Sequence, residues 1–488
     1  MFETNLTSGT GVQKGGEFEL IQADLILSTG IVIGLTGGTL IGLSIFEDIE
    51  QYSLTGNLII QDAMNLASFG PIIGQEYLKL KIRTPTITGA ENIIDFSENA
   101  LMITSLDTRE DIGSGVQAST LSFVSREFVA NQRARVRRNL VGSYSDIVRQ
   151  MLRVDLDSKK RFNFEPSAES KKIIAPNVTP YDIISVAGTF AVSQEHSDPT
   201  YLFFETCHGF NFKTLGHLYT GKPKLKYSQS LAGTKYMPDG AVDILKNISN
   251  IESYQITATP DTIYNYTAGV YSSEMIVHDI ISKSYQKNTY DYIRDFNNER
   301  HIETTSTDGL KKSYPLVNTL NISPDGENVS SFPSRQYLQP TVGYGTDESY
   351  EDDYNQYSFS SNTPHRTILQ RNAQLGMLET GLQVRIEVLG NTLLGAGDIV
   401  ECNIPYTSSY KTSENEEFDR LYRGNFLIKK LRHDFIFTSG FLSGEHTISM
   451  NLCKDDLLDP LHAPSDNYEP TSDKSKGNFE QQWDNITL

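Results

Sequence analysis

The sequence predicts a mainly β protein with some α, built from several small antiparallel β-barrel or tube-like domains and one α+β domain. Three observations lead to this fold class. Tyrosine (25 residues) and phenylalanine (23 residues) are abundant, and both favour strands. Apolar residues alternate with polar ones along several segments, which is the period of a strand with one solvated face. Two segments carry helix-capping motifs, and the 488 residues allow about three or four domains.

The segment Leu25–Phe46 contains no charged residue and raises the question of a membrane span. A helix there would contain several glycines, each costing roughly 1 kcal/mol against alanine, and acidic residues flank it on both sides. We therefore favour strands over a buried or membrane helix, with turns at Gly30 and at Gly38, where glycine would supply a positive φ. The expected strands are Leu25–Leu27, Ile31–Leu35 and Leu40–Phe46. No membrane insertion is expected.

The next segment is expected to continue as strands with one short helix. Gly56 is predicted at a turn, the helix is expected around Ala63–Phe69, and Glu76–Arg83 has the pattern of a strand with one solvated face.

Two further helices are predicted from capping boxes. Ser143 precedes Asp146 in the first, and Thr179 precedes Pro180 and Asp182 in the second. Apolar residues at helical spacing follow each cap: Ile147, Val148, Met151 and Leu152, then Ile183, Ile184, Ala187, Phe190 and Ala191.

Hairpins and alternating strands dominate the rest of the chain. Tyr201–Thr206 is predicted to pair with Phe210–Lys213 across a turn at His208 and Gly209. Near the end, Gly424–Phe437 is predicted to pair with Glu445–Asp455. Between these hairpins, residues 323–362 lack periodicity and carry an acidic run, so they are predicted to form a long mobile loop.

Several of these segments together resemble one protein family. The strings FEDI-x8-LIIQDA, GPIIGQEYLKLKIRTP, FFET-x2-GF-x-F and VLGNTLLGAGDIVECNIP occur in this order between about Gly16 and Asp459. Their order resembles the central baseplate hub protein of T-even-like contractile phage tails. It also resembles the N-terminal hub part of type VI secretion spike proteins.

The resemblance implies a domain organisation. A first tube-like β domain would span 1–125, and an α+β domain with two helices and a β-hairpin would span 126–240. A second tube-like β domain would occupy 241–380 with the acidic loop at 323–362. A small β-barrel domain at 381–459 and a polar C-terminal tail at 460–488 would complete the chain.

The resemblance also implies a structural role in the virion. The chain would form a homotrimer with pseudo-six-fold symmetry in the tail baseplate, adapting a six-fold tail tube to a three-fold central spike and leaving a channel for DNA. Expected partners are the tail tube or tube-initiator protein, the spike, baseplate wedge proteins and the tape measure protein. Assembly would take place in the host cytoplasm. The main alternative is a phage receptor-binding protein or adhesin. A polysaccharide-degrading tailspike is a weaker one, because its stacked repeats are not evident.

The sequence gives no catalytic, cofactor-binding or metal-ligating residues, and we expect no enzyme activity. The pairs Glu47/Asp48 and Glu351/Asp352 are adjacent, so on strands their carboxylates would point to opposite faces, whereas glycosidase carboxylates must converge. Histidines lack the HExxH or HxH spacing of metal sites. Those considered are His208, His217, His278, His433 and His446.

Charge and cysteine content set further limits. The net charge of −19 disfavours specific nucleic-acid binding. On a strand, Arg133, Arg135 and Arg137 would lie on one face. Three roles are open for these arginines, in decreasing order of preference: a solvated surface, contact with acidic residues of a neighbouring subunit, and contact with DNA. The three distant cysteines Cys207, Cys402 and Cys453 indicate a reducing compartment, and the first twenty residues lack the pattern of a secretory signal.

Overall fold

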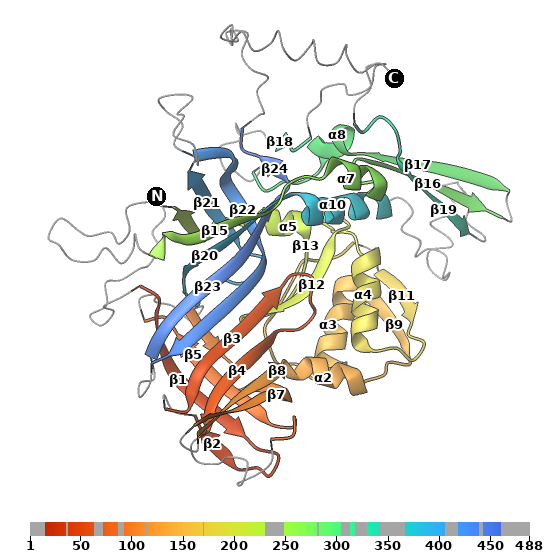
Figure 1. Ribbon diagram of the computed structural model, residues 1–488. Coiled ribbons are helices and arrows are strands. Elements are labelled where there is room, and N and C mark those ends of the chain that lie inside the picture. Colours follow the sequence, from red (N-terminus) through yellow and green to blue (C-terminus); the bar gives the residue numbers. More distant parts are fainter. Residues whose placement is uncertain are drawn as a thin grey trace, which may run out of the picture. The chain divides into compact units, whose positions relative to one another are not determined.

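The structure is a computed structural model, and its fold is mainly β with some α, as predicted (Figure 1). The chain divides into two compact units, Met1–Leu458 and Asp459–Leu488, and the description below concerns the first. The structure describes residues 15–35, 38–62, 72–85, 92–113, 116–168, 170–229, 248–280, 283–303, 313–317, 329–341, 367–405, 418–438 and 443–459. The predicted tail at 460–488 and helix at Ala63–Phe69 lie outside these residues.

Strands account for most of the described elements. The N-terminal strands are β1 (Glu17–Ile26), β2 (Val32–Gly34), β3 (Leu40–Asp48), β4 (Thr55–Asp62), β5 (Tyr77–Arg83), β6 (Ile93–Asp95), β7 (Leu101–Gly113) and β8 (Val116–Val124). The central strands are β9 (Asn139–Ser143), β10 (Phe162–Phe164), β11 (Ser170–Ile174), β12 (Tyr201–Thr206), β13 (Gly209–Thr214), β14 (Leu225–Ser228), β15 (Ile251–Ala258), β16 (Ser272–Asp279), β17 (Ser284–Asp291), β18 (Tyr314–Pro315) and β19 (Arg335–Thr341). The C-terminal strands are β20 (Leu382–Leu389), β21 (Ile399–Pro405), β22 (Phe418–Phe437), β23 (Ser443–Lys454) and β24 (Asp456–Leu457).

Helices are short and lie between the strands. They are α2 (Arg126–Arg133), α3 (Tyr144–Gln150), α4 (Pro180–Phe190), α5 (Leu215–Tyr219), α7 (Thr262–Ala268), α8 (Tyr292–Asp295) and α10 (Ile368–Thr380), with a π-helical turn η2 (Met151–Asp155) and a 3₁₀ turn η3 (Phe296–Asn298).

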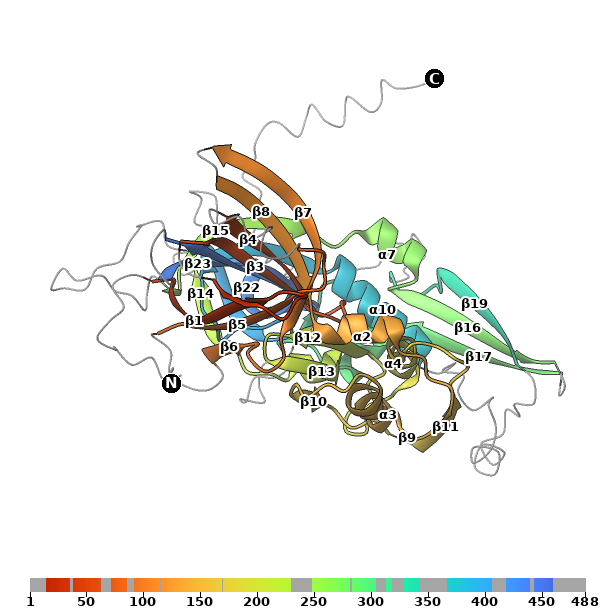
Figure 2. The same ribbon diagram turned by 90° about the horizontal axis from the view of Figure 1, so that it is seen from below.

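The strands of the N-terminal region close into a ring with the help of two C-terminal strands. Antiparallel pairings run β22–β3–β4–β8–β7–β5–β1–β23, and β23 pairs back with β22. We call this cycle the first ring (Figure 2). Alternate side chains point inward, as a closed sheet with a dry interior requires. Its core includes Phe18, Leu25, Ile45, Leu58, Leu78, Ile103, Phe123 and Phe435.

A second ring uses the same two C-terminal strands. Here β21 pairs with β22, β23 with β20, and β20 with β15, while β14 lies parallel to β21. A bridge between Ser228 and Asn250 connects β14 to the start of β15 and completes this second ring. A separate core fills it, including Tyr227, Val384, Ile386, Val400, Phe426, Ile428, Met450 and Leu452. The hairpin β22–β23 is thus shared, and its two ends contribute to two different cores.

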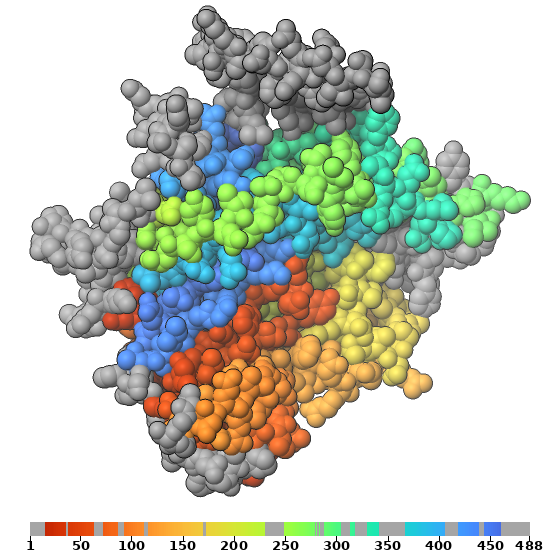
Figure 3. All heavy atoms as spheres, viewed as in Figure 1, coloured from red at the N-terminus to blue at the C-terminus, as the bar shows by residue number. Residues whose placement is uncertain are grey.

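The shared hairpin makes the outer surfaces of the two rings continuous. Strand order across the joint is β4–β3–β22–β23–β20–β15, with each strand hydrogen-bonded to the next. Figure 3 shows the result on one face, where the C-terminal strands in blue lie between the N-terminal strands in red and β15 in green.

Residues 126–228 include an α+β region beside the first ring. The helices α3 and α4 pack on the hairpin β12–β13, and the apolar residues predicted to face inward are buried there, apart from the half-buried Phe190. Both predicted caps are confirmed: Ser143 accepts a hydrogen bond from the amide of Asp146, and Thr179 and Asp182 form a complete capping box with Pro180 at the first turn. The hairpin is confirmed as well, with β12 antiparallel to β13.

A small three-stranded sheet forms a further part of the first unit. Strand β16 lies antiparallel to β17 and parallel to β19. The helices α7, α8 and α10 contribute to its core, which includes Val270, Tyr271, Tyr292, Phe296, Leu369 and Met377. The described residues of 241–380 therefore divide between this sheet and the second ring, which β15 joins.

The uncharged segment Leu25–Phe46 is strand, as predicted. It comprises the end of β1, then β2, then most of β3, and β1 pairs with β2 across a turn at Gly30, whose φ is +85°. Gly38 differs from the prediction, because its φ is not positive and an added Cβ would meet open space. In the described part of the chain, no helix is long and apolar enough to cross a membrane.

Two other expectations are wrong. Gly56 lies within β4 rather than at a turn, and glycine is needed because a Cβ would lie 2.3 Å from Phe123 Cζ and 2.4 Å from the Ser44 carbonyl oxygen. The predicted loop at 323–362 contains a strand, β19, over Arg335–Thr341. This strand was missed because its side chains are mostly exposed or half-buried, so it lacks the apolar alternation of a core strand. Residues 323–328 and 342–362 lie outside the described residues.

The five predicted domain ranges stay a prediction. What the structure shows is that strand pairing crosses three of the predicted boundaries. Strands from 381–459 complete the first ring, β14 pairs with β21, and β15 pairs with β20.

Candidate functional site

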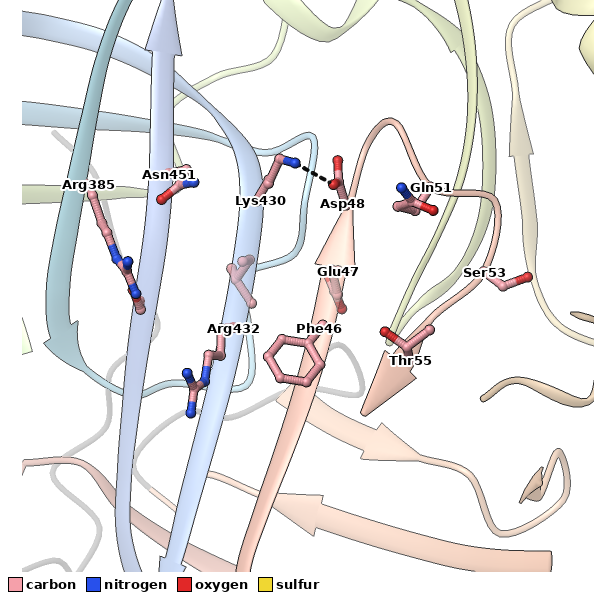
Figure 4. Close-up of a pocket in the computed structure, with 12 residues that line it drawn as sticks. Phe46, Glu47, Asp48, Gln51, Ser53, Thr55, Arg385, Lys430, Arg432 and Asn451 are labelled. Atoms are coloured by element: carbon pink, nitrogen blue, oxygen red, sulfur yellow. Dashed lines mark hydrogen bonds and ion pairs between the residues drawn. The ribbon is translucent and has the colours of Figure 1, made fainter. Parts of the chain in front are cut away.

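A polar groove lies on the outer face of the joint between the two rings. It is a cavity of about 330 Å³ whose lining comes from β3, β4, β20, β22, β23 and the turn after β3. The lining residues are Phe46, Glu47, Asp48, Gln51, Ser53, Thr55, Arg385, Lys430, Leu431, Arg432, Ser449 and Asn451. We call this cavity the joint groove (Figure 4).

Each cation of the joint groove has a polar or charged partner close to it. Lys430 forms an ion pair with Asp48 at 2.9 Å, as Figure 4 shows. Arg432 lies 5.5 Å from the ring centroid of Phe46 and pairs with Asp434 at 2.7 Å. The Arg385 guanidinium donates to the Ser449 hydroxyl at 3.0 Å. The groove is therefore a surface of small polar groups and paired cations, a composition suited to contact with a hydrated partner.

Behind the joint groove lies a fully buried polar cluster that we call the junction cluster. It consists of Glu47 on β3, Cys207 in the turn between β12 and β13, and His433 and His446 on the shared hairpin. One carboxylate oxygen, the thiol sulfur and one imidazole nitrogen of Glu47, Cys207 and His433 all lie within 4.8 Å of one another. Three elements distant in sequence thus meet at one end of the first ring.

Hydrogen bonds hold each member of the junction cluster in place. The amides of Cys207 and Ala396 donate to the two carboxylate oxygens of Glu47, at 2.6 Å and 2.7 Å. His433 Nδ1 and His446 Nε2 are 3.1 Å apart. The Glu47 carboxylate therefore ties the hairpin β12–β13 and the loop before β21 to β3.

Burial controls protonation in the junction cluster. It raises the pKa of Glu47 to about 7, although the two amide donors oppose the shift. Burial, and next the neighbouring Glu47, raise the pKa of the Cys207 thiol well above its usual range. Burial lowers the pKa of His433 to about 3 and lowers that of His446 as well. Near neutral pH the thiol and both imidazoles are therefore uncharged, and Glu47 titrates.

A second buried network connects the α+β region to the first ring. Lys160 Nζ lies 2.7 Å from a Glu127 oxygen and 2.6 Å from a Glu205 oxygen, and all three side chains are nearly inaccessible. The other Glu205 oxygen accepts from the amide of Leu54, just before β4. Two carboxylates share one ammonium group here, so the network is held by charge as well as by hydrogen bonds.

The structure places the acidic and histidine candidates as follows. Glu47 and Asp48 point to opposite sides of β3, one into the junction cluster and one into the joint groove, as predicted for adjacent strand residues. Glu351 and Asp352 lie outside the described residues. Of the histidines, His433 and His446 are brought together, while His208 is at the β12–β13 turn and His278 is on β16. His217 on α5 approaches the buried Glu165 and the half-buried His196.

The predicted strand through Arg133, Arg135 and Arg137 is wrong. Arg133 is the last residue of α2, and Arg135 donates to backbone carbonyls near the end of that helix. Glu127 in the first turn of α2 and Arg133 in its last turn both suit the helix dipole and stabilise the helix. Beyond it, Arg138 makes a two-pronged contact with Asp155 at 2.8 Å and 2.6 Å.

Comparison with known proteins gives structural neighbours only. No family model and no curated protein matches the sequence. Similar solved structures include the tail protein from Neisseria meningitidis MC58, with a TM-score of 0.46 and 11% identity over 90% of this chain and 97% of that chain. Another is the 43 kDa tail protein of prophage MuSo2 from Shewanella oneidensis, with a TM-score of 0.45 and 8% identity over 89% and 98% of the two chains.

A third similar structure is an E. coli component of the type VI secretion system, with a TM-score of 0.38 and 7% identity over 90% of this chain and 76% of that chain. These three similar structures are thus two tail proteins and one type VI secretion component.

Proposed function

We propose that this chain is a structural hub of a contractile phage tail, which forms a homotrimeric ring between a six-fold tail tube and a three-fold central spike. The observation that carries the proposal is the pair of strand rings that share the hairpin β22–β23. Two rings per chain and three chains give 2 × 3 = 6 rings around one axis. Such an assembly presents six contacts to a tube and three to a spike, which is what a symmetry adaptor must do.

The continuous outer face of the joint supports a channel along the axis of this trimer. Antiparallel strands run without interruption from β4 to β15, so this face can form one wall across two adjacent units. In the joint groove, Lys430 and Arg432 are each paired with an aspartate, and Arg385 donates to a serine hydroxyl. A wall of this kind has few unpaired cations with which to hold DNA phosphates. Three chains together have a net charge of 3 × −19 = −57, which also disfavours binding of DNA. The proposed role is structural and needs no catalysis.

Contacts between chains are expected where large apolar side chains stand exposed. Ile256 on β15 and Ile263 and Tyr264 on α7 are 44%, 78% and 55% exposed. Ile256 lies on the last strand of the second ring, and α7, which carries the other two residues, follows that strand in the sequence. Apolar side chains exposed together are typical of protein interfaces, so we assign this region to the contact with a neighbouring chain.

Native mass spectrometry and negative-stain electron microscopy of the purified protein, alone and with its spike partner, test the proposal. The expected particle is a trimer with an opening on its axis. Ile263→Glu should weaken the trimer at least tenfold, because it puts a charge into the contact. Val141→Glu, at a 68% exposed position on β9, is the matched control and should leave the mass unchanged.

The alternative is a phage receptor-binding protein or adhesin. A particle that stays monomeric even with the spike partner, or an elongated fibre without an axial opening, would reject the hub and favour the adhesin. The proposed partners are the tail tube or its initiator, the spike, the wedge proteins and the tape measure protein, and the proposed location is the virion tail.

A further inference from the structure

The junction cluster has the composition of a transition-metal site, although its members are far apart in sequence. Glu47 and Cys207 are 160 residues apart, and β22 supplies His433 much later in the chain. Thiolate sulfur, imidazole nitrogen and carboxylate oxygen are the ligands that zinc takes in proteins. Their candidate ligand atoms lie within 4.8 Å of one another, close enough to converge on one ion with modest side-chain adjustment.

His433 offers a nitrogen that nothing in the described structure uses. Its Nδ1 is joined to His446 Nε2 at 3.1 Å, whereas its Nε2 is buried and has no hydrogen-bond partner among the described residues. An imidazole held through one nitrogen and free at the other is the usual arrangement of a metal-bound histidine, whose second nitrogen is oriented by a neighbouring group. His446 is that neighbour here.

The charges of the junction cluster also fit a divalent cation. Glu47 is 2% exposed, and no salt bridge is recorded for it in the described part of the chain. A thiolate from Cys207 and a carboxylate from Glu47 would carry two negative charges, which a divalent cation balances. Cysteine binds metal as the thiolate, so the ion would take the place of the proton on the Cys207 sulfur.

A route to the junction cluster exists on its Cys207 side. A cavity of about 510 Å³ is lined by Cys207, His208 and Ala396, together with Lys213 and Asp398. Glu47, on the other side, lines the joint groove. The cluster therefore separates two cavities, and an ion can reach the sulfur from the larger one.

We propose that Glu47, Cys207 and His433 bind one zinc ion per chain, with its fourth position open toward the larger cavity. On binding, the Cys207 thiol releases its proton to solvent, and the thiolate donates an electron pair to the zinc. His433 binds through Nε2, and Glu47 binds through one carboxylate oxygen. The site pins the β12–β13 hairpin to the end of the first ring. It is independent of the hub assignment, because it depends on the fold of one chain alone.

The test measures metal in the purified full chain and needs no partner protein. After dialysis against metal-free buffer containing a weak chelator, elemental analysis is expected to find about one zinc per chain. Exchange with Co²⁺ should produce the intense near-ultraviolet band of a thiolate-to-cobalt charge transfer. That band requires a cysteine ligand, and it is measured on the unmodified protein, so it does not depend on any variant folding.

Cysteine variants identify the sulfur. Cys207→Ser should lose the bound zinc and the cobalt band, whereas Cys402→Ser and Cys453→Ser, which change equally buried free cysteines, should retain both. Glu47→Gln keeps the size of the side chain and removes the charged ligand, so it should weaken zinc binding by at least the roughly 10- to 100-fold that changes to the neighbours of metal ligands cause. Circular dichroism checks that each variant folds.

Two results would overturn the proposal. The first is the finding that the unmodified protein contains no zinc and shows no charge-transfer band after incubation with Co²⁺. The other is folded Cys207→Ser protein that binds zinc as tightly as the unmodified chain. The hub assignment would survive either result, since trimer formation is measured separately.

Discussion

Replacing Lys160 by methionine removes the ammonium group shared by two buried carboxylates. Lys160 is 6% exposed, and Glu127 and Glu205 are 1% and 0% exposed, so water cannot take the place of the lost cation. Breaking a buried ion pair on one side typically costs about 3–5 kcal/mol, because an uncompensated charge remains in the interior. We expect a loss of that size in the free energy of unfolding, measured by urea denaturation at neutral pH.

The pH dependence gives a sharper signature. In the unmodified protein, burial raises the pKa of Glu205. Burial also acts on Glu127, but Lys160 and Ser158 outweigh it and lower that pKa. Without Lys160 both carboxylates should have raised pKa values. A group whose pKa is raised by folding binds its proton more tightly in the folded state. Its contribution to folding stability is therefore present at low pH and lost as pH rises through the pKa of the folded state. The Lys160→Met variant should therefore lose more stability at pH 8 than at pH 5.

Controls separate this effect from a general loss of packing. Lys226 pairs with Glu401 at 2.5 Å, but its side chain is 64% exposed, and Lys226→Met should cost about 0–1 kcal/mol at most. Adding Glu127→Gln and Glu205→Gln to Lys160→Met should restore part of the stability, because the stranded charges are removed. A loss below 1 kcal/mol that does not vary with pH would refute the reasoning.

Further predictions concern single positions. Gly56→Val should destabilise the protein by about 1–3 kcal/mol or more, because its Cβ would overlap Phe123. Gly38→Val should change the stability by less than about 0.5 kcal/mol, because its Cβ would meet open space. Thermal unfolding that shows Gly38→Val to be the more destabilising substitution would contradict the structure. Although burial opposes its charge, His301 has its pKa raised to about 9 by Asp455. The contribution of His301 to the free energy of unfolding should be complete below about pH 6.5 and lost as pH rises to about 9. The variant His301→Gln should therefore show a flatter dependence of this free energy on pH between these two values.

Local features were predictable from sequence because they depend on neighbouring residues. The capped starts of α3 and α4 follow from Ser143 and Thr179, and the strand character of Leu25–Phe46 follows from glycine content and flanking charge. The hairpin β22–β23 was predicted from the alternation along its second strand.

What the sequence does not indicate is that one hairpin completes two rings. In β22, residues 426–429 are all buried, so the strand changes from one core to the other without a simple alternation. The pairing of β1 with β23 joins opposite ends of the described chain, and local periodicity carries no information on such contacts. The junction cluster was missed for the same reason, since His433 has no motif spacing to Glu47 or Cys207.

The stretch from Arg133 to Arg137 was assigned to a strand because alternating arginines match a period of two. In the structure Arg133 is instead the last residue of the helix α2.

The shared hairpin also determines when this protein can fold during its synthesis. Strands β3 and β4 leave the ribosome early, but β22 begins only at Phe418 and β23 ends at Lys454. At typical rates of roughly 5–20 residues per second, several tens of seconds pass before either ring can close. During that time β1 and β3 expose unpaired edges to other nascent chains, and chaperones would be needed to protect them. A chain truncated before Phe418 would lack the hairpin that both rings need, so neither ring can close until the residues up to Lys454 have been synthesised.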